Sequence, residues 1–294
     1  MTSYHLTSVP VRGGDLAVGV WGPEDGPVLL AVHGITASHL AWSWLAQALP
    51  DHRIIAPDLR GRGRSGELPG PWGMSQHAED LIAVLDHFSL DAVRVVGHSM
   101  GGFVSATLGM NYPERVIDIL LVDGGLPLPV PKGVAPEDLP EALIGPAAQR
   151  LALTFASEDA YLDFWREHPA FGADWNETLE DYLRYDLKGE APNLRSTVSA
   201  DAVRQDSLEL ALDTEYPARL REVEPALTFL RTERGLLNEE PPLYPLEQLE
   251  GWKARLPNIR CVLVDDINHY TITMSSRGIA HILEYLNIHQ GVTP

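Results

Sequence analysis

The chain has 294 residues, a formal net charge of −19 and one cysteine. Hydrophobic residues make up 45% of it and charged residues 21%. This balance predicts one large α/β domain, or a core with an inserted subdomain, and excludes general disorder. The acidity argues against nucleic acid as a partner, because phosphates would be repelled, and the one short basic run, Arg60-Gly61-Arg62-Gly63-Arg64, does not change that.

The cysteine usage and the N-terminal sequence predict a cytoplasmic protein. Cys261 has no partner within the chain, which suits a reducing compartment, and it is expected to pack as a small apolar residue. The first residues lack a basic stretch followed by an apolar one. No segment approaches the roughly eighteen apolar residues of a membrane span.

Extended and helical segments alternate from the start of the chain. Extended segments at 4–11 and 16–21 are joined at Gly13-Gly14, which favours a hairpin turn. The apolar run at 28–32 suits a strand buried on both faces. The pattern then predicts helices at 40–49, 75–88 and 103–112 and strands at 53–56, 93–96 and 117–122. Such alternation indicates right-handed βαβ crossovers and a mostly parallel sheet.

The alternation breaks after Gly124, and the chain up to about Arg219 shows helical pieces but no convincing strand. This stretch is rich in aromatic side chains, namely Phe155, Tyr161, Phe164, Trp165, Phe171, Trp175, Tyr182 and Tyr185. Most of them are expected to form a small core of their own. Some should face the carboxyl ends of the strands, where ligands bind.

The strand and helix pattern returns in the last part of the chain, which sets the predicted domain organisation. Strands are expected at 226–231 and 259–264, and helices near 246–256 and 275–286. We therefore expect a core domain made of residues 1–125 and 220–294, with a helical cap, or lid, domain at 126–219.

The most informative motif is Gly97-His98-Ser99-Met100-Gly101-Gly102, which lies between a β-branched run and a helix-forming segment. In that context Gly-x-Ser-x-Gly is typical of a nucleophile elbow, a tight turn that lifts the serine hydroxyl clear of the sheet. Taken alone, the motif also fits a serine that caps a helix. The strand before it and the helix after it favour Ser99 as a nucleophile.

A serine hydroxyl needs an adjacent base, and 11 histidines are available. His269 is favoured because it follows a strand and so lies at the same sheet edge as Ser99. His98 is expected to pack with its side chain away from the nucleophile, and His33 to brace the loop after its strand.

The base in turn needs a carboxylate, and the sequence offers two. Asp123 follows the strand at 117–122, and Glu233 follows the strand at 226–231. Asp265 and Asp266 are too close to the histidine in the chain to be favoured.

The oxyanion formed on attack needs two N–H donors, and both are expected from the backbone. The residue after the nucleophile, Met100, should supply one, and Ile35 in the loop after the strand at 28–32 should supply the other.

The chain carries four motifs that occur together in one family: His33-Gly34, Asp58-x-Arg60-Gly61-x-Gly63-x-Ser65, the Gly97–Gly102 turn and Asn268-His269. Together they resemble the α/β-hydrolase superfamily, over nearly the whole chain. The resemblance implies an α/β-hydrolase fold with a mostly parallel eight-stranded sheet, flanking helices and a helical cap inserted after the sixth strand. It also implies the chain order nucleophile, acid, base.

This chain departs from the family's usual pattern at the acid. Most members place it after the seventh strand, where this chain has Glu233 with an arginine next to it. Certain lipases and mycotoxin lactonases place it after the sixth strand, which Asp123 matches. Members with an aspartate at the elbow are dehalogenases and epoxide hydrolases, and Ser99 argues against those activities.

The favoured interpretation is a serine hydrolase that cleaves a small apolar ester or lactone through an acyl-enzyme, with Ser99, His269 and Asp123 as the triad. No metal or organic cofactor is implied, because the sequence has no His-Glu-x-x-His, paired Cys-x-x-Cys or Gly-x-Gly-x-x-Gly motif. One alternative is hydrolysis of a carbon–carbon bond by the same triad. The other is a receptor-like protein that binds a ligand on this fold.

Overall fold

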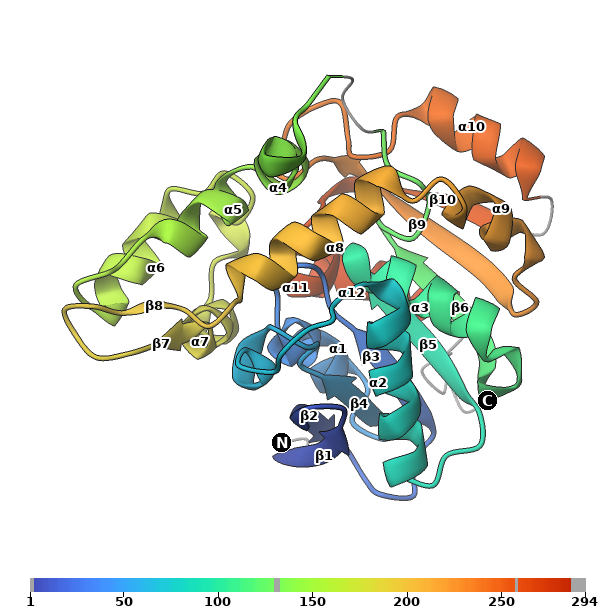
Figure 1. Cartoon of the computed structure of the whole chain (residues 1–294), viewed down its shortest axis with the longest axis horizontal. Helices are drawn as coiled ribbons and strands as arrows, with labels where there is room; N and C mark the ends of the chain where they lie inside the picture. Colours follow the sequence, from blue (N-terminus) through green and yellow to red (C-terminus); the bar gives the residue numbers. More distant parts are fainter. Residues whose placement is uncertain (1–2, 130–132, 257–258, 287–294) are drawn as a thin grey trace, which may run out of the picture.

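The computed structural model describes residues 3–129, 133–256 and 259–286, and its centre is an eight-stranded sheet (Figure 1). Across the sheet the order is β1-β2-β4-β3-β5-β6-β9-β10. The strands are β1 (Tyr4–Val11), β2 (Gly14–Trp21), β3 (Val28–Val32), β4 (Arg53–Pro57), β5 (Val93–His98), β6 (Val116–Val122), β9 (Ala226–Arg234) and β10 (Arg260–Asn268). Strand β2 is antiparallel to both its neighbours and the other pairs are parallel, which confirms the predicted mostly parallel sheet.

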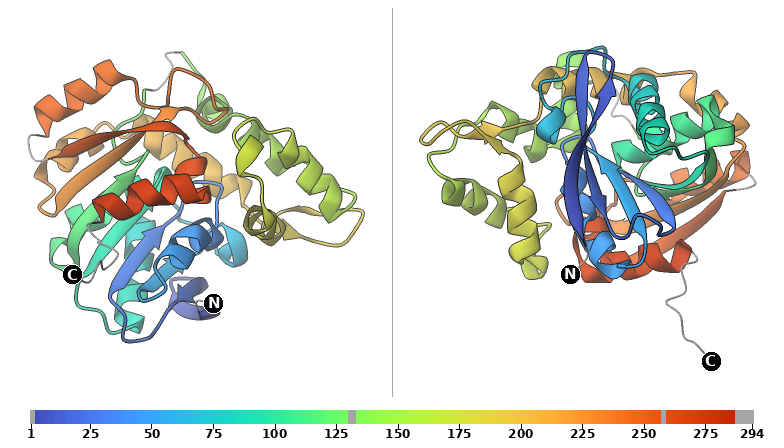
Figure 2. Two further views of the ribbon diagram at one scale, coloured as in Figure 1. Left: turned by 180° about the vertical axis from the view of Figure 1, so that it is seen from behind. Right: turned by 90° about the horizontal axis from the view of Figure 1, so that it is seen from below.

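Helices cover both faces of this sheet (Figure 2). Successive residues of a strand point to opposite faces, so in β3 Leu30 and Val32 pack into one core while Leu29 and Ala31 pack into the other. The first core includes side chains of α2 (Met74–His87), α3 (Met100–Asn111) and α10 (Leu246–Arg255). The second includes side chains of α1 (Ser43–Ala48) and α12 (Ser276–Tyr285). Within the described ranges, no helix is both long and apolar enough to cross a membrane.

The chain between β6 and β9, residues 126–225 and called the insertion below, is mainly helical. Its helices are α4 (Leu139–Ile144), α5 (Pro146–Gln149), α6 (Glu158–Arg166), α7 (Glu177–Tyr185), α8 (Ala200–Leu212) and α9 (Tyr216–Arg219). Helices α5 to α7 extend to one side of the sheet, and α8 leads back toward α9 (Figure 1). A helical insertion after the sixth strand is therefore confirmed, while the division into domains at residues 126 and 219 stays a prediction.

Two details of the insertion and of the sheet differ from the sequence-based expectation. The insertion does contain strands, β7 (Leu187–Lys188) and β8 (Arg195–Ser196), which pair antiparallel. Two residues are too few to show any periodicity, so no sequence pattern indicated these strands. Strand β10 runs on to Asn268, beyond the end expected at residue 264. Its pairing with β9 is irregular between Val264 and Asn268, so the alternation of side chains that would indicate a strand is broken there.

Candidate active site

Ser99 lies at the tight turn between β5 and α3, with φ of 56° and ψ of −125°. The backbones around it approach so closely that side chains are excluded. A Cβ at Gly97 would collide with the carbonyl oxygen of Gly101, and one at Gly101 with that of Val32. A Cβ at Gly124, which follows β6, would collide with the backbone of Ser99 itself. The glycines of the motif are therefore needed for the turn, as a nucleophile elbow requires.

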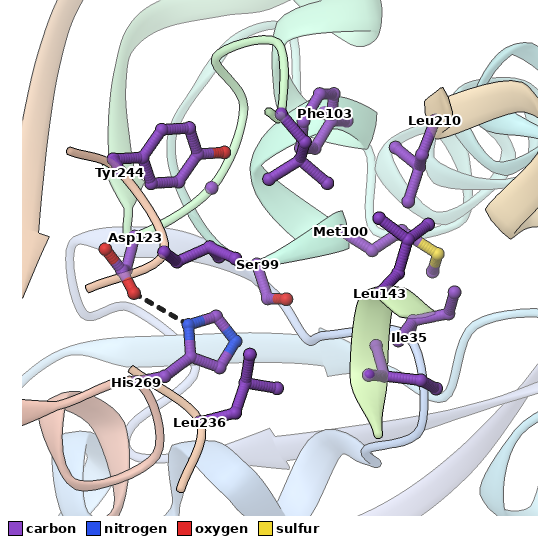
Figure 3. A pocket seen from close by; sticks show the side chains of 14 residues that line it. Ile35, Ser99, Met100, Phe103, Asp123, Leu143, Leu210, Leu236, Tyr244 and His269 are labelled. Atoms are coloured by element: carbon purple, nitrogen blue, oxygen red, sulfur yellow. Dashed lines mark hydrogen bonds and ion pairs between the residues drawn. The ribbon is translucent and has the colours of Figure 1, made fainter. Parts of the chain in front are cut away.

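His269 and Asp123 are brought together although they are 146 residues apart in the chain (Figure 3). His269 directly follows β10, and its Nδ1 lies 2.7 Å from Oδ2 of Asp123, which follows β6 and is fully buried. The carboxylate also accepts hydrogen bonds from the hydroxyl and the N–H of Thr232, at 2.9 and 3.2 Å. A carboxylate on Nδ1 keeps the proton there and leaves Nε2 free to act as a base.

The other candidate acids are engaged elsewhere. Glu233 lies within β9, and its Oε2 accepts a hydrogen bond of 2.7 Å from the N–H of Asp266. Its neighbour Thr232 is the residue that faces Asp123, and successive strand residues point to opposite faces. Asp265 is exposed, and Asp266 is exposed and pairs with Arg277. The geometry favours Asp123, and nothing in the sequence singled out Thr232 as its partner.

His98 does more than the packing expected from the sequence. Its Nε2 donates a 2.7 Å hydrogen bond to the carbonyl oxygen of His269, and the two rings lie 4.7 Å apart. Burial, together with the nearby His269, lowers the pKa of His98 well below its usual value. The ring is therefore neutral, and it fixes the backbone of the candidate base without adding a charge beside it.

Residues 33–37, called the oxyanion loop below, follow β3 and are braced by His33. Its Nδ1 donates to the carbonyl oxygen of Gly34 at 2.8 Å, and its Nε2 accepts from the N–H of Leu59 at 2.9 Å. Complete burial lowers the pKa of His33 to about 4, so the ring is neutral and can accept at Nε2. The bracing role expected from the sequence is present.

The N–H groups of Ile35 and Met100 are available to a substrate. Neither donates to a protein acceptor within the described ranges, and both residues border the cavity that contains Ser99 and His269. Met100 is the first residue of α3, so its N–H is one of the unpaired donors at a helix N-terminus. Two free donors beside a serine hydroxyl can stabilise an oxyanion.

Two cavities meet at Ser99 and His269. The first, of about 400 Å³, is walled by core and insertion side chains that include Phe103, Leu128, Leu143, Leu210, Leu236 and Leu243 (Figure 3). The second, of about 360 Å³, adds Thr36, Tyr182, Tyr270 and Met274. Tyr182 belongs to α7, so one of the insertion's aromatic residues does face the site. Among the residues that the structure describes, no lysine or arginine lines either cavity.

Cys261 is not among the described residues that line either cavity. Cys261 is half-buried in β10, and burial raises the pKa of its thiol to about 11, which leaves it protonated at neutral pH. Within the described ranges, no group of three or more His, Cys, Asp or Glu side chains could hold a metal ion.

Comparison with known families agrees with this arrangement. The sequence model of the alpha/beta hydrolase fold family matches residues 27–272. The chain belongs to this family. The structure of this α/β hydrolase is similar to that of E-2-(acetamidomethylene)succinate hydrolase, with a TM-score of 0.79 and 19% identity over 97% of this chain and 100% of that one. The thioesterase domain from the curacin biosynthetic pathway gives a TM-score of 0.76 at 19% identity, over 97% and 99% of the two chains. At these identities the likeness shows the fold alone.

Relatives by sequence carry the names of several kinds of hydrolase. The chain is 39% identical over 114 residues to Lipase LipV of Mycobacterium tuberculosis, which is 39% of this chain and 43% of that one. It is 34% identical over 134 residues to the bifunctional esterase/perhydrolase DCH of Acinetobacter calcoaceticus, covering 44% and 48%. The putative carbamate hydrolase RutD of Variovorax paradoxus is 36% identical over 107 residues, covering 35% and 40%. The chain spans less than half the length of these relatives.

We expect replacement of His33 by asparagine to change how stability depends on pH. The folded-state pKa of His33 is about 4, whereas the unfolded chain has the ordinary value of about 6.5. Between these values the unfolded state binds more protons. The contribution of His33 is therefore complete above about pH 6.5 and lost as the pH falls toward 4. Between pH 7.5 and pH 5 the wild type should lose about 2 kcal/mol that the variant does not lose.

Urea unfolding at both pH values measures this difference. Identical pH dependence of the two proteins would show that His33 is not held neutral in the folded state.

Proposed function

We propose that this α/β hydrolase is a serine hydrolase that cleaves neutral carboxylic esters, lactones among them, through an acyl-enzyme. The observation that carries the proposal is the convergence of four groups on one cavity: Ser99, the His269–Asp123 pair, and the free N–H groups of Ile35 and Met100. Each role has its own group, and each group lies at the carboxyl end of a strand or at the start of α3.

The reaction follows from these positions. The Ser99 hydroxyl attacks the ester carbonyl while Nε2 of His269 takes its proton, and the carbonyl oxygen becomes an oxyanion held by the two N–H groups. The oxyanion collapses, and the alcohol leaves with the proton from His269. Water then attacks the acyl-enzyme, its proton passes to His269 and on to the Ser99 oxygen, and the acid is released. Asp123 stabilises the imidazolium in both halves.

Ser99 Oγ and His269 Nε2 are not hydrogen-bonded in the structure, although both side chains border the cavity (Figure 3). Bonds of this kind often tighten only when substrate is bound. The two cavities that meet at Ser99 offer space for the acyl group and for the leaving alcohol.

An active-site serine probe tests the nucleophile directly. We expect a fluorophosphonate to label the folded wild type at Ser99 and to leave Ser99→Ala unlabelled, because only the activated hydroxyl attacks phosphorus. Intact-protein mass spectrometry measures the adduct, and circular dichroism confirms that the variant is folded. An unlabelled wild type with no activity on short p-nitrophenyl esters would contradict the proposal, and labelling without any turnover would favour ligand binding.

The choice of acid is tested by a matched pair of amide substitutions. Asp123→Asn should lower kcat by about 10³- to 10⁴-fold, because the amide no longer fixes the required tautomer of His269. Glu233→Gln should leave kcat unchanged, since within the described part of the chain Glu233 accepts a hydrogen bond only from the backbone N–H of Asp266. Steady-state kinetics on one ester compare the two variants, and the reverse ranking would make Glu233 the acid.

The described lining of the two cavities offers no cationic side chain to pair with a substrate carboxylate, and this makes a prediction about substrates. p-Nitrophenyl butyrate should have a kcat/KM roughly 100-fold or more above that of mono-p-nitrophenyl succinate, because an unpaired carboxylate loses several kcal/mol on burial. The two esters share a leaving group, so the comparison isolates the acyl charge. Equal values would show that the site tolerates or pairs a carboxylate.

A further inference from the structure

Arg62 contacts both residues whose N–H groups face the candidate site. It lies in the loop after β4 and is completely buried. Its Nε donates a hydrogen bond of 2.8 Å to the carbonyl oxygen of Ile35, and its Nη2 lies 3.8 Å from Sδ of Met100. In the sequence Arg62 stands out only as part of the short basic run at 60–64, but in the structure its side chain is buried.

The counter-ion of Arg62 comes from the insertion. Nη2 of Arg62 lies 2.6 Å from Oδ2 of Asp206, a buried residue of α8. The same carboxylate accepts hydrogen bonds from the N–H of Gly73 at 2.7 Å and from His77 at 3.1 Å. Burial alone would raise the pKa of Asp206, but Arg62 and His77 outweigh it and lower the pKa to about 2. Asp206 is therefore charged, and it fixes the position of the guanidinium.

A second arginine holds the next carbonyl of the oxyanion loop. Arg150 of the insertion is buried, and its Nη2 donates to the carbonyl oxygen of Thr36 at 3.0 Å. Its counter-ion is Asp186, at 3.1 Å, also in the insertion. Two successive carbonyls of the loop thus accept from buried arginines, and both arginines depend on aspartates of the insertion.

These contacts determine where the N–H of Ile35 points. That N–H belongs to the Gly34–Ile35 peptide plane, which is held at its carbonyl end by His33. The following plane is held by Arg62 at the carbonyl of Ile35, and the plane after that by Arg150 at the carbonyl of Thr36. Because a planar peptide turns as a unit, the bond at the Gly34 carbonyl sets the direction of the Ile35 N–H, and the bonds at the next two carbonyls keep the adjoining planes from turning.

We propose that Arg62 and Asp206 are positioning residues, through which the insertion holds the oxyanion loop in the orientation that binds the transition state. The inference rests on the proposed function, because it takes the N–H groups of Ile35 and Met100 as the oxyanion donors. Neither residue of the pair lines a cavity at Ser99, so neither touches substrate.

The chain offers a matched control in the same loop. Arg60 and Asp80 form a second buried pair, with Nη2 and Oδ1 2.7 Å apart and exposed fractions of 1% and 2%. Arg60 donates to the carbonyl of Pro69 and to Asp80, and it holds neither Ile35 nor Met100. Asp206→Asn and Asp80→Asn therefore remove the same charge from similar surroundings, but only the first removes the counter-ion of Arg62.

The test compares kcat, KM and inhibition by butylboronic acid, which forms a tetrahedral serine adduct resembling the transition state. We expect Asp206→Asn to lower kcat roughly 10- to 100-fold with little change in KM, and to weaken boronate inhibition by a similar factor, because a misplaced oxyanion donor loses transition-state binding. Asp80→Asn should keep the wild-type kcat and boronate inhibition, while it loses about as much thermal stability as Asp206→Asn does.

A double variant, Arg62→Met with Asp206→Leu, guards against misfolding, since replacing a buried ion pair by apolar residues is often tolerated. It should fold and show the same loss of kcat and of boronate inhibition. A double variant with wild-type kcat, or equal losses in the Asp80 and Asp206 variants, would overturn the inference. Failure of the proposed function would look different, because the wild type itself would then lack ester hydrolysis and fluorophosphonate labelling.

Discussion

The structure depends above all on the close approach of backbones at the turn between β5 and α3. No side chain fits at Gly97, Gly101 or Gly124, so the ends of β3 and β6 come within van der Waals contact of the turn. Ser99 is forced to a positive φ there, with its hydroxyl at the edge of the sheet. Apart from Met100, the other groups of the site reach that edge from other parallel strands: the oxyanion loop follows β3, Asp123 follows β6 and His269 follows β10.

Buried polar groups keep this edge in one arrangement. The rings of His33 and His98 are neutral because burial lowers their pKa values, and each is tied to a backbone carbonyl of the site. Around them the charged groups are paired, as in Arg62 with Asp206. A buried group with a satisfied hydrogen bond is costly to move, since movement leaves its partner without one. The geometry of the candidate site is thus maintained by the buried polar groups around it.

Much of this site could be predicted from the sequence, because Ser99, His269 and Ile35 each lie next to a strand with a clear local pattern. The acid could not be decided in the same way. Asp123 and Glu233 both follow predicted strand ends. The choice between them depends on which residue at the end of β9 has its side chain on the same face of the sheet as Asp123. A shift of one residue moves each side chain to the other face, so the choice of acid requires the register of the sheet. In the structure Thr232, and not Glu233, faces Asp123.

The insertion was the least predictable part, for a related reason. Leu143 and Leu210 reach the cavity at Ser99 through the packing of α4 and α8 over the sheet edge, and no local periodicity encodes that packing. The basic run at 60–64 gave a similar difficulty, since a count of charges cannot distinguish a solvated arginine from one buried against a distant aspartate.

The long sequence separations of the buried pairs also bear on how the protein is made. Asp123 meets His269 across 146 residues, and Arg150 meets the carbonyl of Thr36 across 114. During synthesis the first six strands of the main sheet and Arg62 leave the ribosome before α8 brings Asp206, and burying an arginine without its counter-ion costs several kcal/mol. The oxyanion loop therefore cannot take up its final conformation until the insertion has folded, and His269 is synthesised later still. A chain that ends before α8 has Ser99 on its turn but lacks both Asp206 and His269.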